Sequence, residues 1–269
     1  MKKRRKTDKV LGTSAGRQYN ADVSRFVVAT VAWAMLTTSP RVERPTPFAV
    51  GETLTYDVSW STALSAGTVV STVKEKKASF NSTAFYIVAE GRPAPLLSKL
   101  YTFYYKVDTL LDVYTLLAQR GSVYSEEGQR HRFGATLFDR MRNRASFEHT
   151  TTTVVKSEFA VQPGAQDLLS ALYVVRTMPL KAGDRIAVPV SDGGTNYRVQ
   201  MAVGTPEPVQ VPLGSSSAWK VTLVITDAAS QQVGRNVAVW LSTDSRRLPL
   251  KAQAELPVGA FVLGLRDVK

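Results

Sequence analysis

Apolar and polar residues alternate along much of the chain after residue 48. The segments 53–60, 197–203 and 219–225 place an apolar side chain at almost every second position, which is typical of strands that bury one face. Turn-forming sequences separate such runs, among them EEG at 126–128, DGG at 192–194 and PEP at 206–208. We expect about a dozen short antiparallel strands, because strand and helix patterns do not alternate as they do in βαβ folds.

One segment has the period of a helix. In QDLLSALYVVRTM, residues 166–178, apolar side chains form one stripe and polar side chains lie elsewhere on the helical wheel. The stripe consists of Leu168, Leu169, Leu172, Tyr173 and Met178, and the polar set of Gln166, Ser170 and Arg176. A single helix with such a stripe must pack on a sheet. We therefore predict an all-β, mainly antiparallel fold: a strongly curved, half-open barrel or β-spiral, with helix 165–178 packed in its concavity and filling it.

The N-terminal segment has the features of a secretory signal. The chain opens with MKKRRK, and residues 26–36, FVVATVAWAML, form an apolar run followed by small residues. This run is shorter than the roughly 20 residues of a membrane-spanning helix. We expect residues 1–47 to be the leader and residues 48–269 to be one β-rich domain exported to the periplasm. No cleavage site is clean, so an uncleaved leader that contacts the inner membrane is an open alternative.

Composition narrows the classes of partner and cofactor. The net charge is +12, but residues 1–47 hold ten basic and three acidic residues, which leaves only +5 for the rest. Those charges are mostly scattered, so no nucleic-acid partner is expected. The chain has no cysteine, which excludes disulfides and a lipid-modified N-terminal cysteine. His131 and His149 lack the spacing of a zinc site, and we expect neither a metal nor a cofactor.

Three blocks stand out from these patterns. They are GETLTYDVSW at 51–60 with AG at 66–67, QDLLSALYVVRTMPLKAGD at 166–184, and VWLSTDSRRLPLKAQAEL at 239–256. In this order they resemble a bacterial family known as domain of unknown function 3108, over roughly residues 48–265. The resemblance implies an exported, predominantly β envelope protein with no established activity and no catalytic motif. Such proteins are similar in build to β-spiral envelope-integrity proteins and, more distantly, to lipoprotein carriers.

Residues 243–247 form a first candidate site, because two arginines follow an aspartate in the link between two strands. Arg246 and Arg247 could hold a carboxylate or phosphate by bidentate hydrogen bonds. Alternatively, Asp244 accepts hydrogen bonds within its own turn and pairs with one arginine. We favour the turn, because adjacent side chains on an extended chain point to opposite faces.

Aromatic residues form a second candidate site. The run YTFYY at 101–105 places rings on both faces of a strand, so some should face the interior and others a groove or a partner. The candidates for the interior or a groove are Tyr56, Trp60, Phe103, Tyr105, Tyr173 and Trp240.

These observations favour a non-enzymatic, exported scaffold or binding domain that contributes to cell-envelope integrity. Its expected partner is an envelope lipid or another envelope protein. One alternative is a periplasmic carrier of lipid or lipoprotein acyl chains, in which the helix lines a cavity. A second is a cell-wall hydrolase or transferase that uses carboxylates such as Asp57, Asp108 and Asp112. A continuous apolar cavity would favour the carrier. A filled interior with exposed aromatic patches would favour the scaffold. Convergent carboxylates with perturbed pKa values would favour the enzyme.

Overall fold

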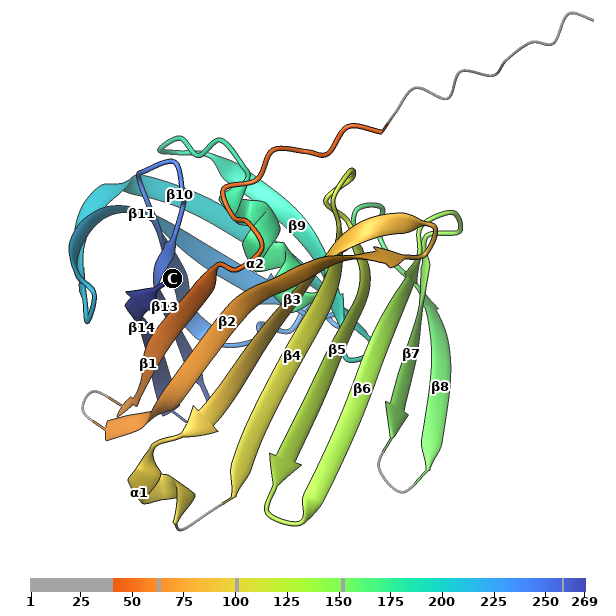
Figure 1. Ribbon diagram of the computed structural model, residues 1–269, viewed down its shortest axis with the longest axis horizontal. Coiled ribbons are helices and arrows are strands. Elements are labelled where there is room, and N and C mark those ends of the chain that lie inside the picture. Colours follow the sequence, from red (N-terminus) through yellow and green to blue (C-terminus); the bar gives the residue numbers. More distant parts are fainter. Residues whose placement is uncertain (1–40, 62–63, 100–101, 151–152, 258) are drawn as a thin grey trace, which may run out of the picture. The chain divides into compact units, whose positions relative to one another are not determined.

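The computed structural model describes residues 41–61, 64–99, 102–150, 153–257 and 259–269 (Figure 1). They form one antiparallel sheet of fourteen strands and two short helices. The strands are β1 Thr53–Trp60, β2 Leu64–Ser79, β3 Ser82–Pro93, β4 Phe103–Asp112, β5 Ala118–Glu127, β6 Arg130–Asp139, β7 Arg144–Thr150, β8 Val154–Ala160, β9 Arg185–Asp192, β10 Thr195–Val211, β11 Gly214–Thr226, β12 Arg235–Ser242, β13 Pro249–Leu256 and β14 Gly259–Val268. Helix α1, Pro95–Ser98, precedes β4, and helix α2, Leu168–Arg176, precedes β9.

Most of the expected leader, residues 1–40, lies outside the described part of the chain, as does Tyr101 of the aromatic run. Two described residues of this expected leader contact the sheet. Glu43 accepts a hydrogen bond from Lys76 of β2, and the Arg44 N–H donates to the Val113 carbonyl just after β4. Within the described residues, no helix has both the length and the apolar character needed to cross a membrane.

The first and last strands meet in the middle of the sheet. The order is β8-β7-β6-β5-β4-β3-β2-β1-β14-β13-β12-β11-β10-β9, so β8 and β9 are the edges. The chain passes from one edge to the other through α2, and the sheet bends around this helix (Figure 1). Leu169 and Tyr173 pack against residues of β2–β4, whereas Val175 packs against residues of β9–β12. The helix thus connects the two halves of the sheet through its side chains.

Side-chain and loop contacts link the two edges without pairing β8 with β9. Gln166 forms an isolated parallel bridge with Val190 of β9, and its side-chain amide hydrogen-bonds main-chain groups at the β4–β5 turn. The Asn196 amide donates to the Ala160 carbonyl at the end of β8 over 2.8 Å. The antiparallel β class, with a helix packed on the inner face, is confirmed. The stronger curl of a β-spiral is not present, because the sheet stays open with β8 and β9 as its edges.

The expected turn at 206–208 is wrong. Strand β10 continues through Pro206 and Pro208, which pair with Trp219 and Ser217 of β11. Proline has no N–H to donate, so it is tolerated in a strand only where one side needs no ladder bond. Strand β9 pairs with β10 only as far as Ala202, and beyond that residue one side of β10 has no strand neighbour.

The buried face of α2 also differs from the prediction. The helix is shorter than expected, and it begins after Asp167, whose carboxylate accepts a hydrogen bond from the Ser170 N–H over 2.9 Å. The expected polar set is buried: Gln166, Ser170 and Arg176 are at most 3% exposed, whereas Leu168 is 62% exposed. The reason is that the buried polar groups find hydrogen-bond partners inside the protein.

Candidate ligand-binding site

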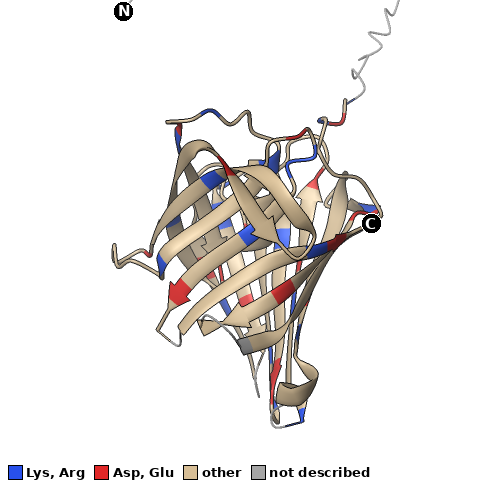
Figure 2. Cartoon of the chain, turned by 90° about the vertical axis from the view of Figure 1, so that its left-hand side faces the viewer, with Lys and Arg blue, Asp and Glu red and all other residues tan. Residues whose placement is uncertain are grey.

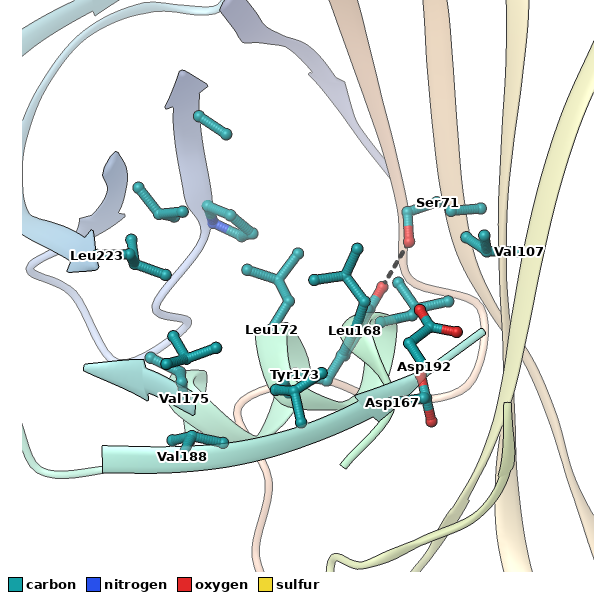
Figure 3. A pocket seen from close by; sticks show the side chains of 18 of the residues that line it. Ser71, Val107, Asp167, Leu168, Leu172, Tyr173, Val175, Val188, Asp192 and Leu223 are labelled. Carbon is teal, nitrogen blue, oxygen red and sulfur yellow. Dashed lines mark hydrogen bonds between the residues drawn. The ribbon is translucent and has the colours of Figure 1, made fainter. Parts of the chain in front are cut away.

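An apolar cavity lies between α2 and the inner face of the sheet. Its volume is about 330 Å³, which is within the range of small-molecule sites. Strands β1–β5 and β9–β14 contribute to its wall together with α2. Figure 3 shows Leu168 and Leu172 on the side of α2 that faces this space, with Val107 and Leu223 on opposite walls. We call this space the helix cavity.

Helix α2 lines the interior and does not fill it. Leu168 borders the helix cavity and is 62% exposed, and Leu172 beside it is only partly buried. The expectation of a filled concavity is therefore wrong. Physically, a helix of nine residues uses its buried face to contact the surrounding strands. Its other apolar side chains do not reach across the space that β1–β5 and β9–β14 border.

A second cavity of about 580 Å³ lies where β1–β4 and β14 approach α1. Its wall is rich in aromatic rings. Trp60 stacks on Phe261, and Phe103 stacks on Tyr105, each pair with ring centroids 6.4 Å apart. Val69 lines both cavities, so apolar surface continues from α2 toward α1. We call this second space the aromatic cavity.

Several polar side chains interrupt the apolar wall of the helix cavity, and three of them carry hydroxyl groups where α2 meets β1 and β2. The Ser71 and Tyr173 side chains share a hydrogen bond of 2.9 Å (Figure 3). Tyr56 of β1 is 6% exposed and lines the same cavity. Burial raises the pKa of Tyr173 to about 12, and burial together with the neighbouring Tyr173 raises the pKa of Tyr56 further. All three groups are therefore neutral hydroxyls at physiological pH.

Two carboxyl groups lie beside the start of α2. Asp167 caps the helix and also accepts a hydrogen bond from the Thr109 hydroxyl over 2.6 Å. Burial raises the pKa of Asp167 to about 6, and Asp192, whose own pKa burial also raises, contributes to that shift. Gly121 makes room for this cap, because a Cβ at this position would lie 2.6 Å from the Asp167 Cβ.

The structure distributes the aromatic candidates over three places. Tyr56 and Tyr173 line the helix cavity, whereas Trp60, Phe103 and Tyr105 line the aromatic cavity. Trp240 lines neither. It is 4% exposed in a core cluster, and its indole N–H donates to Glu207 over 2.7 Å.

The Asp244 cluster forms a turn between β12 and β13. The Asp244 carboxylate accepts hydrogen bonds from the Ser242 hydroxyl (2.7 Å) and the Arg246 N–H (3.1 Å), and the Arg246 guanidinium lies 3.6 Å away. Partial burial raises the pKa of Asp244, but these hydrogen bonds and the Arg246 charge outweigh it and hold the pKa below its usual value. Arg247 has a left-handed backbone with φ of 48°. This geometry supports the turn interpretation.

The carboxylates of the enzyme alternative have separate partners. Asp57 pairs with Arg266 and Asp108 with Arg120, each over 2.7 Å, while Asp112 accepts hydrogen bonds in the β4–β5 turn. Asp108 and Asp112 are four residues apart on one strand, about 13 Å at strand spacing, and Asp57 lies three strands away.

Charged and metal-binding groups are dispersed as well. In the view of Figure 2, basic and acidic residues are interspersed along the strands. Among the residues that the structure describes, no three His, Cys, Asp or Glu side chains gather closely enough to hold a metal ion.

A family model described as protein of unknown function, DUF3108, matches residues 55–266. The chain belongs to this family. The match spans β2 to β13 and most of β1 and β14, and it includes every residue that lines the two cavities except Leu54. No curated protein matches this chain.

A similar fold occurs in a solved structure. A β-barrel-like protein of domain of unknown function DUF1849 from Brucella abortus aligns with a TM-score of 0.53 at 10% identity, covering 82% of this chain and 97% of its own. At this identity the likeness concerns the fold alone. A candidate exported protein with a YmcC-like fold from Bacteroides fragilis gives 0.32 at 8% identity, over 85% and 100% of the two chains. A candidate lipoprotein from Parabacteroides distasonis gives 0.36, also at 8% identity and the same coverage.

Proposed function

We propose that this DUF3108 protein is a non-enzymatic, exported binding protein that holds an acyl chain of an envelope lipid or lipoprotein in its helix cavity. The observation that carries the proposal is the combination of an apolar space of about 330 Å³ with a helix that leaves Leu168 62% exposed toward it. An apolar wall gains free energy when an apolar guest replaces the water beside it. A flexible hydrocarbon chain is the guest whose chemistry matches such a wall.

The aromatic cavity supports a chain longer than the helix cavity could hold by itself. Both spaces share Val69, and the second is lined by the stacked pairs Trp60–Phe261 and Phe103–Tyr105. An acyl chain can therefore extend along the inner face of β1 and β2 from α2 toward α1. The scaffold alternative required a filled interior, whereas the helix cavity is open. Trp60, Phe103 and Tyr105 are 37–40% exposed and border the aromatic cavity.

Native mass spectrometry of the full-length protein from the envelope fraction tests this proposal. We expect the folded protein to carry an additional mass that organic extraction releases as an acyl lipid. A Leu168→Arg variant should lose that mass, because a charge is placed at the cavity wall, at a position exposed enough to tolerate it. Leu213→Arg is the matched control, since Leu213 is 47% exposed and lines neither cavity.

The control should retain the lipid and the melting temperature of the wild type. Wild-type protein that is reproducibly free of lipid would contradict the proposal. So would a Leu168→Arg variant that carries as much lipid as the wild type.

A further inference from the structure

The helix cavity contains hydrogen-bond donors without acceptors. Tyr56, Ser71 and Tyr173 lie where α2 meets β1 and β2, and all three line the cavity. Tyr56 is 6% exposed, and no group in the described ranges accepts a hydrogen bond from its hydroxyl. The Ser71 and Tyr173 hydroxyls bond only to each other, over 2.9 Å, among these residues.

The three hydroxyl groups have more O–H donors than hydrogen bonds within the cluster. Three hydroxyl groups supply three O–H donors, and only one of them is used, in the bond between Ser71 and Tyr173. Buried polar groups are normally hydrogen-bonded. The other polar side chains of the wall, Asp108, Ser122, Asp167 and Asp192, belong to β4, β5, the start of α2 and the end of β9. The cluster therefore has two O–H donors to offer to a guest in the cavity.

A buried ion pair lies beside this cluster. The buried guanidinium of Arg176 lies 5.1 Å from the Tyr173 ring and pairs with Glu52. Its effect on the pKa of Tyr56 and of Tyr173 is larger than that of Glu52 and opposite in sign. Glu52 thus offsets the Arg176 charge only in part at these two phenols, and the neighbouring Tyr173 opposes it at Tyr56.

We propose that the Tyr56 and Ser71–Tyr173 hydroxyls hold the carbonyl oxygen of the acyl ligand. A carbonyl oxygen has two lone pairs and can accept from both free donors. The cavity thereby selects a fatty acid or its ester over a plain hydrocarbon. This inference rests on the proposed function, because it assigns the position of the ligand's carbonyl group within the same cavity.

Calorimetric titration of the full-length protein, freed of lipid, compares three ligands delivered from cyclodextrin: dodecanoic acid, methyl dodecanoate and dodecane. We expect the wild type to bind at least one carbonyl ligand more tightly than dodecane. Tyr56→Phe should weaken the binding of that ligand by about threefold to tenfold, as one lost hydrogen bond does, and leave dodecane unchanged. Tyr86→Phe is the matched control, because Tyr86 lies on β3 outside both cavities.

The ligand series also identifies the source of the carbonyl. Equal binding of acid and ester points to ester-linked lipids, and binding of the acid alone points to a free fatty acid. Equal affinity of the wild type for all three ligands would overturn the inference and leave the proposed function standing. Binding of none of them would overturn both. These comparisons on the wild type are decisive even if the Tyr56→Phe variant fails to fold.

Discussion

Arg176 is the residue of α2 whose loss should cost the most stability. Its side chain is 0% exposed and forms a bidentate ion pair with Glu52 over 2.7 and 2.8 Å. It also donates to the carbonyl oxygens of Arg246 and Arg247 over 3.1 and 3.2 Å. One guanidinium thus joins the end of α2, the residue before β1 and the β12–β13 turn.

The Arg176→Ala substitution removes this donor and leaves its partners buried. The Glu52 side chain is 11% exposed, so its charge would lack both a partner and full hydration. Removing one member of a buried ion pair typically costs about 3–5 kcal/mol. For a domain of this size, each kcal/mol lowers the melting temperature by roughly 2–4 °C. We therefore expect the melting temperature to fall by about 6–20 °C.

Urea denaturation followed by circular dichroism measures the free energy of unfolding directly. Arg266→Ala is the matched control, because Arg266 pairs with Asp57 over the same 2.7 Å but the two side chains are 49% and 40% exposed. An exposed pair contributes about 0–1 kcal/mol. If Arg176→Ala were no more destabilising than Arg266→Ala, burial of the pair would not be what holds α2 in place.

Three further predictions concern α2 and its start. Burial raises the folded-state pKa of Asp167 from 3.8 to about 6, so the free energy of unfolding should fall by about 3 kcal/mol as pH rises from 3.8 to 6 and slightly above. Urea denaturation at several pH values measures this fall, and Asp167→Asn should flatten it. Gly121→Ala should cost about 1–3 kcal/mol by overpacking in the same assay, whereas Gly91→Ala, whose added Cβ meets nothing closer than 3.7 Å, should cost less. Leu169→Ala should lower the free energy of unfolding by about 2–5 kcal/mol, because Leu169 is 8% exposed. An equally large decrease in Leu168→Ala would show that Leu168 is packed and does not face an open cavity.

The sequence predicts much of the sheet, because strand periodicity is local. The run from 53 to 60 is strand β1, and DGG at 192–194 is a hairpin turn with Gly193 and Gly194 both left-handed. The Pro206–Pro208 segment is mispredicted because proline is compatible with both a turn and a strand that lacks one neighbour. Only the order of the strands reveals which of these applies.

The buried face of α2 cannot be predicted from the period of apolar residues, for a related reason. Polarity places Arg176 on the solvent side of the wheel, but its partner Glu52 lies 124 positions away in the chain. Nothing in one sequence joins two such positions. Asp167 is different, because an aspartate directly before an apolar helical run is a recognisable N-cap signal. The hydroxyl cluster is also invisible from the sequence, since Tyr56, Ser71 and Tyr173 come from three separate elements.

Polar contacts at the two ends of α2 explain how an open cavity is compatible with a stable fold. At the first end, Asp167 binds Thr109 of β4, and at the other, Arg176 binds Glu52 and the β12–β13 turn. These contacts fix the position of the helix in both halves of the sheet. The apolar side that carries Leu168 is then not needed to hold the helix by close packing. That side can remain unfilled in the free protein and be covered when an acyl chain binds.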